Sequence, residues 1–129
     1  MTKIAIVGGV AGGATVASQI RRLNKDAEIT IYERYNEISY GACGMPYHIS
    51  GEVSSRDKLL NLTPDDFLKR NIKVSLNSEV VSIDADKQEL TIVDSQSKIE
   101  YQEPYDYLVL SPGGSPKIMA ELKDVAQAF

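Results

Sequence analysis

The chain is poor in residues that mark several classes of protein. It has one cysteine, no tryptophan and two phenylalanines among its 129 residues. A single cysteine cannot close an internal disulfide, so the sequence predicts a reducing, cytoplasmic compartment. No metal site is predicted.

Long apolar runs and long basic runs are also missing. The first apolar run covers residues 4–7 and breaks at Gly8, short of the roughly 7–15 residues of a signal peptide. No run approaches the ~18 apolar residues of a membrane span. No basic run exceeds the pair Arg21 and Arg22, and 14 basic against 18 acidic residues give a net charge of -4. We therefore expect neither a membrane nor a nucleic acid as partner.

What is present is the composition of an ordinary folded domain. With 43% hydrophobic and 25% charged residues, the chain falls outside the disordered and fibrous classes. Its length fits one domain, in which about two-thirds of the unfolded surface can be buried.

The first third of the chain predicts a strand, a helix and a second strand. Residues 4–7 are a continuously apolar run, typical of a strand buried on both faces of a parallel sheet. A helix is expected from about residue 12 to residue 23. A second strand is expected over residues 29–32 and closes on Glu33. This order indicates a right-handed βαβ unit and hence an α/β fold.

The turn between the first strand and the helix carries most of a dinucleotide-binding pattern. G-x-G-x-x-G falls on Gly8, Val10 and Gly13, so valine replaces the middle glycine. Gly8 allows the tight turn, Gly13 lets the helix pack close to the sheet, and the first helical N–H groups face a pyrophosphate. Glu33 lies twenty residues after Gly13, where a carboxylate accepts hydrogen bonds from an adenosine ribose. The alternative is a glycine-rich turn in another kind of α/β protein.

The helix expected over residues 12–23 has two faces. Because successive residues are about 100° apart, apolar side chains gather on one face and polar side chains on the other. The apolar face holds Val16, Ile20 and Leu23, and the polar face holds Thr15, Ser18, Gln19 and Arg22. A polar face of this kind is typical of a solvated surface, and its closeness to the cofactor end makes an anionic-ligand site the alternative.

The single cysteine lies in a glycine-rich segment bounded by proline. Residues 39–48 show no sustained helical or strand period. Cys43 is either a small buried hydrophobe or a reactive thiol. The second interpretation is supported by Pro46, which favours a helix start just beyond the cysteine, since a helix N-terminus stabilises a thiolate. His48 lies where two-cysteine flavin disulfide reductases have their second cysteine, so disulfide chemistry here needs an external thiol or a sulfenic acid. His48 can tune the thiolate or be structural.

Three segments resemble one family of flavoproteins. They are residues 3–22 (KIAIVGGVAGGATVASQIRR), residues 32–34 (YER) and residues 39–51 (SYGACGMPYHISG). Together they resemble the single-cysteine branch of the pyridine nucleotide-disulfide oxidoreductases, the branch of the coenzyme A-disulfide reductases. The glycine turn of that branch also has a non-glycine residue at the position of Val10. Its cysteine motif, Ser-Phe-x-x-Cys, is matched here with tyrosine in place of phenylalanine.

The resemblance implies a Rossmann-like FAD-binding domain and a role for individual residues. Cys43 is implied as the redox-active nucleophile. The implied coenzyme A contacts are Thr15, Gln19, Arg22 and Ser39. The implied FAD contacts are Gly8, Gly9, Val10, Ala11, Gly12, Gly13, Glu33, Arg34, Ser111, Pro112 and Gly113. Ala42 stands where the family has a further contacting asparagine, which leaves a related persulfide or polysulfide open as substrate.

The rest of the chain predicts scaffold and a second cofactor turn. Thr63, followed by Pro64 and two acids, indicates a helix start, and this helix is expected to end near residues 70–71. Residues 105–110 predict a buried strand, and the turn at residues 111–113 resembles the family's second FAD-contacting turn. Short β segments, which predict a small β-rich meander, cover residues 72–76, 80–83, 89–93 and 98–101.

The extent of the resemblance sets the predicted domain boundaries. Residues 1–116 are assigned to the N-terminal part of an FAD/NAD(P)-binding domain, and residues 117–129 to a tail. Residues 118–129 have the pattern of a short amphipathic helix. Because family chains are several times longer and add a nicotinamide domain and a dimerisation domain, the fold is expected to be incomplete relative to the family.

The implied activity is an NAD(P)H-dependent reduction of coenzyme A disulfide, or of a related persulfide or polysulfide, through Cys43. Hydride passes from the nicotinamide to FAD, and electrons then reach the cysteine sulfur. Thr15, Gln19 and Arg22 favour this branch over an NADH oxidase or peroxidase that uses a cysteine sulfenate. A non-catalytic nucleotide-binding fragment is the other alternative. The 129 residues alone are expected not to oxidise NAD(P)H, and full-length family members are expected to be homodimers.

Overall fold

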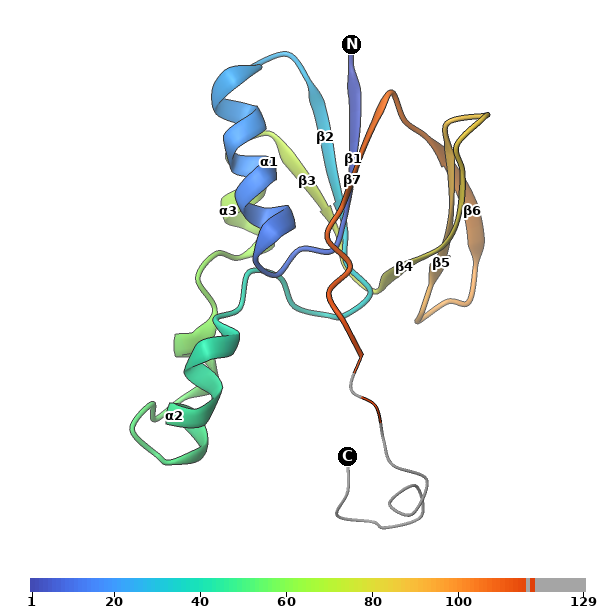
Figure 1. The fold of residues 1–129 in the computed structure, drawn as a ribbon. Helices are drawn as coiled ribbons and strands as arrows, with labels where there is room; N and C mark the ends of the chain where they lie inside the picture. Colours follow the sequence, from blue (N-terminus) through green and yellow to red (C-terminus); the bar gives the residue numbers. More distant parts are fainter. Residues whose placement is uncertain (116, 118–129) are drawn as a thin grey trace.

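The computed structural model describes residues 1–115 and 117, which form two sheets joined by helices and turns (Figure 1). A parallel sheet has the strand order β3-β2-β1-β7, and an antiparallel sheet has the order β4-β5-β6. The parallel strands are β1 (Lys3–Val7), β2 (Glu28–Tyr32), β3 (Ile72–Ser75) and β7 (Tyr107–Leu110). The antiparallel strands are β4 (Ser78–Asp84), β5 (Glu89–Asp94) and β6 (Glu100–Pro104). The predicted α/β fold, a parallel βαβ core with a small meander, is confirmed.

Helices cover one face of the parallel sheet and the meander covers the other (Figure 1). Helix α1 (Gly12–Leu23) connects β1 to β2, and α3 (Pro64–Leu68) leads into β3. Side chains alternate across each strand, so Ile6 packs in the core beneath the helices while its neighbour Ala5 packs against the meander. Among the described residues, no helix combines the length and the apolar character needed to cross a membrane.

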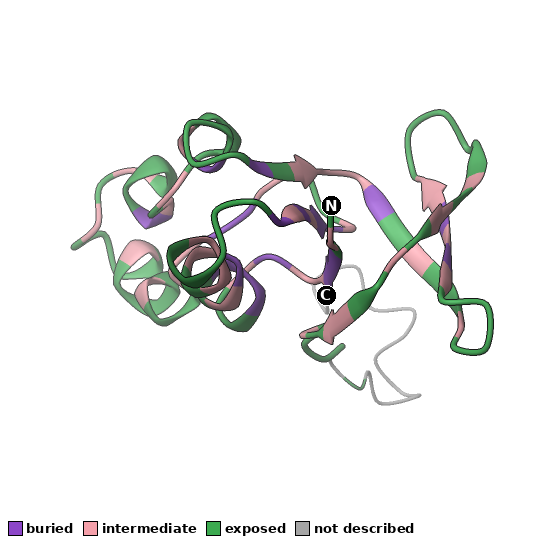
Figure 2. Cartoon of the chain, turned by 90° about the horizontal axis from the view of Figure 1, so that it is seen from above, coloured by how far each residue is buried: buried purple, intermediate pink, exposed green. Residues whose placement is uncertain are grey.

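Burial is concentrated where the two covering layers meet the sheet (Figure 2). Phe67 on α3 and Ile72 on β3 are completely buried on the helical side, and Leu90 and Ile92 on β5 are completely buried on the other side. Each such side chain contributes roughly 1.5–3 kcal/mol relative to an exposed position. The sheet is therefore a rigid platform for the loops at the ends of its strands.

The chain between β2 and α3 makes an excursion away from the sheet (Figure 1). It contains the 3-10 turn η1 (Ala42–Gly44), helix α2 (Met45–Ile49) and the 3-10 turn η2 (Arg56–Leu59). The two ends of the excursion meet in an isolated antiparallel bridge between Tyr40 and Leu60. The excursion is thus closed at its base, next to the sheet.

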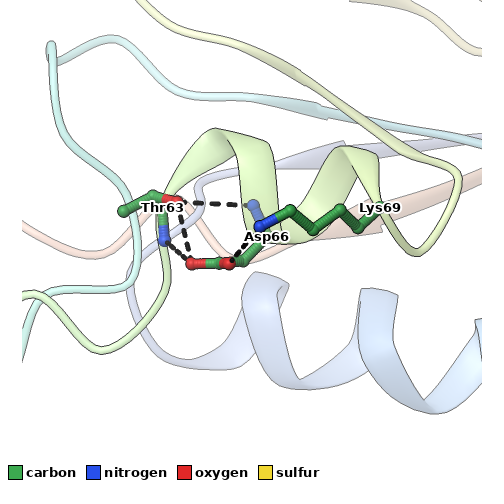
Figure 3. Close-up of polar contacts among 3 residues, drawn as sticks. All are labelled: Thr63, Asp66 and Lys69. Atoms are coloured by element: carbon green, nitrogen blue, oxygen red, sulfur yellow. Dashed lines mark hydrogen bonds and ion pairs between the residues drawn. The ribbon is translucent and has the colours of Figure 1, made fainter.

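A capping box begins α3 (Figure 3). The Thr63 hydroxyl accepts a hydrogen bond from the Asp66 N–H at 3.3 Å, and the Asp66 carboxylate accepts one from the Thr63 N–H at 3.0 Å. With Lys69 at 3.5 Å, these hydrogen bonds hold the pKa of the Asp66 carboxyl below its ordinary value, the Thr63 contacts being the larger cause. The predicted start is confirmed, but α3 ends at Leu68 rather than near Asn71, whose φ of 56° is left-handed.

Residues 72–76 were predicted within the meander, and this prediction is wrong. Strand β3 instead extends the parallel sheet, pairing Ile72 with Ile29 of β2. The reason is tertiary: α3 packs on the helical face and delivers β3 to the edge of the parallel sheet.

Two further strand predictions change. The strand expected over residues 98–101 is shifted along the chain and observed as β6 (Glu100–Pro104). Lys98 precedes it in a turn, with a left-handed φ of 60°. The strand expected over residues 105–110 begins at Tyr107 and is an edge strand of the described sheet, with Tyr107 and Leu110 65% and 58% exposed. It is therefore not buried as expected. Residues 118–129, the expected tail helix, lie outside the described residues.

Candidate functional site

The loop after β1 packs backbone directly against backbone. Gly8 has a φ of 89°, which glycine adopts without strain. A methyl group at Gly8 would overlap the carbonyl oxygen of Ser111, and one at Gly13 would overlap the carbonyl oxygen of Gly8. Only glycine fits at these two positions, so the turn, the start of α1 and the end of β7 lie close together.

The N-terminus of α1 offers hydrogen-bond donors. Its N-cap residue, Ala11, makes no side-chain cap, and its first turn contains no acidic residue. The first N–H groups of a helix have no partner within the helix, and the helix dipole adds partial positive charge there. This end of α1 therefore has the character of a phosphate-binding turn.

Glu33 follows β2 and is buried beside the glycine turn, with 4% of its surface exposed. Its Oε2 accepts a hydrogen bond from the Gly9 N–H at 2.8 Å, and its Oε1 accepts one from the Tyr35 N–H at 3.1 Å. These backbone donors fix the carboxylate at the carboxyl end of β2. Its oxygens keep lone pairs for further donors, such as ribose hydroxyls.

The glycine turn and Glu33 border a cavity of about 310 Å³, called here the nucleotide cavity. The predicted cofactor residues that line it are Gly8, Gly9, Val10, Glu33, Arg34, Ser111, Pro112 and Gly113. Ala11, Gly12 and Gly13 do not line it; the two glycines pack against Ser111 and Gly8. The sequence reasoning missed Glu79 and Val80, which reach the cavity from β4 only because the antiparallel sheet folds back beside β2.

The residues of the nucleotide cavity fit one part of an extended dinucleotide such as FAD, the ribose and the neighbouring phosphate. The glycine turn packs so closely on the end of β7 that no Cβ atom fits at Gly8, the uncapped start of α1 follows that turn, and Glu33 presents a carboxylate to the cavity. The same three features hold the diphosphate and the ribose in dinucleotide-binding folds. Two further lining residues contact each other: the Arg34 guanidinium stacks 4.8 Å from the centre of the Tyr35 ring.

A second cavity, of about 510 Å³, is called here the thiol cavity because Cys43 lines it. Cys43 is exposed and lies in η1. All the predicted substrate contacts line the same cavity: Thr15, Gln19, Arg22 and Ser39. The polar face of α1, including Ser18, is therefore a cavity wall as well as a solvated surface. Asn61 and Arg70 also line it and were missed from the sequence, because they lie in connecting segments with no local pattern.

Ser39 joins the two cavities through its backbone. It is 7% exposed and has a φ of 55°. Its N–H donates to the Gly9 carbonyl at 3.0 Å, and its own carbonyl accepts from the N–H of Asn61 at 3.0 Å and from the Asn61 side-chain amide at 3.1 Å. The glycine turn of one cavity is thereby tied to the wall of the other.

The thiol cavity is lined by positive charges and by no carboxylate. Arg22 comes from the last turn of α1 and Arg70 from the turn before β3, and no Asp or Glu of the described residues lines the cavity. The whole chain has a net charge of -4, so this positive character is local. Guanidinium groups bind phosphates in bidentate geometry. The cavity therefore suits an anionic ligand whose reactive part reaches Cys43.

Val10 and Tyr40 line both cavities and form their shared wall. The backbone of Tyr40 is fixed on both sides. The Gly41 N–H donates to the Leu59 carbonyl at 2.6 Å, and Tyr40 itself bridges to Leu60. Ligands in the two cavities would thus be neighbours.

His48 lies apart from the thiol cavity, which it does not line. Its Nδ1 is 2.8 Å from the Val53 carbonyl oxygen, a contact that holds the ring within the excursion. The helix expected after Cys43 is present as α2, but it has only five residues. This geometry favours a structural role for His48.

Comparisons with known proteins match most of the chain. The family model described as pyridine nucleotide-disulphide oxidoreductase matches residues 2–129. The coenzyme A disulfide reductase of Staphylococcus haemolyticus (strain JCSC1435) is 48% identical over 114 residues, which cover 88% of this chain and 26% of that protein. The chain thus spans about a quarter of the length of the curated relatives it matches.

Two solved structures share the fold. Reduced CoADR-RHD from Bacillus anthracis has a TM-score of 0.88 and 44% identity, covering 92% of this chain and 21% of that chain. The water-forming NADH oxidase from Lactobacillus brevis, bound to NADH, has a TM-score of 0.87 and 31% identity, covering 92% of this chain and 26% of that chain.

Proposed function

Because the chain belongs to the pyridine nucleotide-disulphide oxidoreductase family, we propose that it forms the FAD-binding front part of an NAD(P)H-dependent flavoprotein reductase. The proposed substrate is coenzyme A disulfide, or a related persulfide or polysulfide, and the proposed nucleophile is Cys43. The observation that carries this proposal is the thiol cavity, in which Cys43, the polar face of α1 and two arginines lie beside the nucleotide cavity.

In this proposal FAD occupies the nucleotide cavity. Glu33 accepts hydrogen bonds from the ribose, the start of α1 binds the diphosphate, and residues 111–113 close the site from the end of β7. Bound FAD supplies the two-electron carrier between NAD(P)H and the cysteine sulfur.

Cys43 carries the disulfide chemistry. Its thiolate attacks one sulfur of the substrate, so that a mixed disulfide forms and one substrate thiolate leaves. Two electrons and one proton then split the mixed disulfide into the Cys43 thiolate and the second substrate thiol. The exposed position of Cys43 in η1 leaves its sulfur accessible to a substrate of this size.

Arg22 and Arg70 are proposed to bind the phosphates of coenzyme A, and the neutral donors of the cavity wall to bind its remaining polar groups. The contacting residues proposed from the family are Thr15, Gln19, Arg22 and Ser39. Ala42 stands where the family has an asparagine that contacts coenzyme A, and it offers no side-chain amide. For this reason the proposal keeps a smaller persulfide or polysulfide as an alternative substrate.

The proposal is tested by the reaction of Cys43 with two disulfides of different charge. The purified native chain is mixed with coenzyme A disulfide or with neutral hydroxyethyl disulfide, and mass spectrometry follows the mixed disulfide. Each rate is divided by the rate of the same chain unfolded in urea, which removes the intrinsic reactivity of the disulfide.

We expect the folded chain to favour coenzyme A disulfide. Arg22→Gln should slow that reaction about tenfold and leave the neutral disulfide unaffected, because only the former presents phosphates to Arg22. Cys43→Ser should give no adduct with either reagent. Equal normalised rates for the two disulfides in the native chain would contradict the proposed substrate class.

Reduction of peroxide or oxygen is the second candidate, supported by the likeness to the NADH oxidase of L. brevis. Here the Cys43 thiolate attacks the O–O bond of hydrogen peroxide, which yields a sulfenic acid and hydroxide. A normalised rate with peroxide above that with coenzyme A disulfide would favour this candidate.

We further propose that the whole protein acts in the cytoplasm, as a homodimer, and uses NADH or NADPH. The single cysteine supports a reducing compartment, and the resemblance to the family supports the dimer. The 129-residue chain alone is proposed not to oxidise NAD(P)H. FAD-dependent NADH consumption by the purified chain would contradict this last statement.

A further inference from the structure

Arg21 lies next to Arg22 on α1, but its side chain does not line the thiol cavity; it binds backbone carbonyls beside a separate surface cavity of about 420 Å³. Its Nη1 donates to the carbonyl oxygens of Asn24 at 3.2 Å and Lys25 at 2.6 Å. Its Nη2 donates to the carbonyl oxygens of Ala27 at 2.6 Å and Asn71 at 2.7 Å. One planar guanidinium thus binds four carbonyl groups, as its fixed fork of donors allows.

Three of these bonds cap the end of α1, and the fourth crosses to a distant segment. Asn71 lies 50 positions along the chain, in the left-handed turn between α3 and β3. Within the described residues no other hydrogen bond joins the end of α1 to that turn. The Nε of Arg21 is buried without a partner, so the side chain gives up one hydrogen bond to reach these carbonyls.

Each segment that Arg21 joins carries one cation of the thiol cavity. Arg22 follows Arg21 directly, and Arg70 precedes Asn71 directly. The turn that carries Arg70 is also held by short-range hydrogen bonds to α3, from Arg70 N–H to the Phe67 carbonyl and from Asn71 N–H to the Leu68 carbonyl, and by the pairing of β3 with β2 that begins at Ile72. The Arg21 bridge is therefore the direct hydrogen bond between this turn and the end of α1, in addition to the sheet pairing that anchors β3.

We propose that Arg21 is a positioning residue that sets the separation of Arg22 and Arg70 and thereby the affinity of the thiol cavity for a phosphate-bearing ligand. This inference rests on the proposed function, since it takes coenzyme A as the ligand of that cavity. Arg21 itself touches no ligand. Arg21 acts through Arg70, because it binds the backbone carbonyl of Asn71, the residue that follows Arg70.

The test is a double-mutant cycle measured with reduced coenzyme A as the probe. Isothermal titration gives its dissociation constant for the native chain, for Arg21→Gln, for Arg70→Gln and for the double variant. We expect Arg21→Gln alone to weaken binding about fivefold, and to weaken it less than twofold when Arg70 is already glutamine. A group that only stabilises the fold would instead weaken binding by the same factor in both backgrounds.

Two controls separate positioning from folding and from charge. Arg21→Lys keeps the charge and part of the bonding, so its affinity for coenzyme A should lie between those of Arg21→Gln and the native chain. If the glutamine variant fails to fold, the same cycle with Arg70→Gln is measured with Arg21→Lys in its place. Lys25→Gln removes an exposed positive charge at the same end of α1 and should leave coenzyme A binding within twofold of the native value.

FAD affinity distinguishes the possible failures. It should stay within twofold of native in Arg21→Gln, because the nucleotide cavity contains neither segment. Additive effects of Arg21→Gln and Arg70→Gln would overturn the positioning role and leave the proposed function intact. A native chain that binds no coenzyme A would overturn both the positioning role and coenzyme A as the ligand of the thiol cavity, and would leave the persulfide or polysulfide as the proposed substrate.

Discussion

The nucleotide cavity and the thiol cavity share a wall but are built in different ways. The nucleotide cavity lies at the carboxyl ends of parallel strands, where a glycine turn and the end of β7 meet backbone to backbone. The thiol cavity is lined by one face of α1 and by residues of three connecting segments. The first is therefore a fixed feature of the fold, whereas the chemistry of the second can be changed one side chain at a time.

The largest effect should come from the backbone contact behind the nucleotide cavity. In Gly13→Ala the new methyl group overlaps the carbonyl oxygen of Gly8. We expect the free energy of unfolding to fall by about 3 kcal/mol, measured by urea denaturation. Gly114→Ala is the matched control, because a Cβ there meets nothing within 4 Å, and it should change stability by less than about 0.5 kcal/mol. Equal urea midpoints would show that the turn is not close-packed.

The next effect separates the two cavities by ligand. Glu33→Gln removes the charge of the buried carboxylate proposed to hold the ribose, so FAD affinity should fall about thirtyfold. Coenzyme A affinity should stay within twofold of native. Fluorescence titration with FAD measures the first value and calorimetry the second. The exposed Glu52→Gln serves as control, and a parallel loss of both affinities in Glu33→Gln would mean that the two cavities are not independent sites.

A smaller loss of affinity is expected at Arg22, and it should affect coenzyme A rather than FAD. Arg22→Gln should weaken coenzyme A binding about tenfold, since one charge-assisted contact to phosphate is lost. FAD binding should not change, because Arg22 does not line the nucleotide cavity. The native affinity for coenzyme A should fall with rising salt, and less steeply in Arg22→Gln. An unchanged salt dependence would place the phosphates elsewhere.

The smallest effect concerns α3, which lines neither cavity. Because hydrogen bonds from Thr63 lower the pKa of Asp66 in the folded chain, the charged form of Asp66 stabilises the fold above its unfolded pKa, and this contribution disappears as pH falls through the folded value. Asp66→Asn should thus be less stable than native at pH 7 and equally stable at about pH 2, in urea unfolding at both pH values. A difference that persists in acid would contradict the pKa shift as its cause.

The sequence predicted best the parts that are determined locally. The bounds expected for α1 coincide with Gly12–Leu23, and the turn at Gly8 has the positive φ that such a turn requires. Thr63 and Pro64 correctly marked the start of α3. In each case a few adjacent residues contain the whole physical cause, whether a backbone angle, a cap or a helical period.

What the sequence could not predict depends on contacts between distant segments. Residues 72–76 have the composition of any short strand, and only the packing of α3 assigns them to the parallel sheet. Asn61 and Arg70 lie in connecting segments, and Glu79 reaches the nucleotide cavity from β4. Thr15, Gln19 and Ser39 do meet Cys43 in one cavity, while their role in binding a substrate stays a prediction.

The most direct test of the two-cavity account is a crystal structure of the chain with FAD bound and with coenzyme A joined to Cys43 as a mixed disulfide. The account predicts the FAD diphosphate at the start of α1 with its ribose on Glu33, and the coenzyme A phosphates between Arg22 and Arg70. Density for either diphosphate outside its assigned cavity would contradict it.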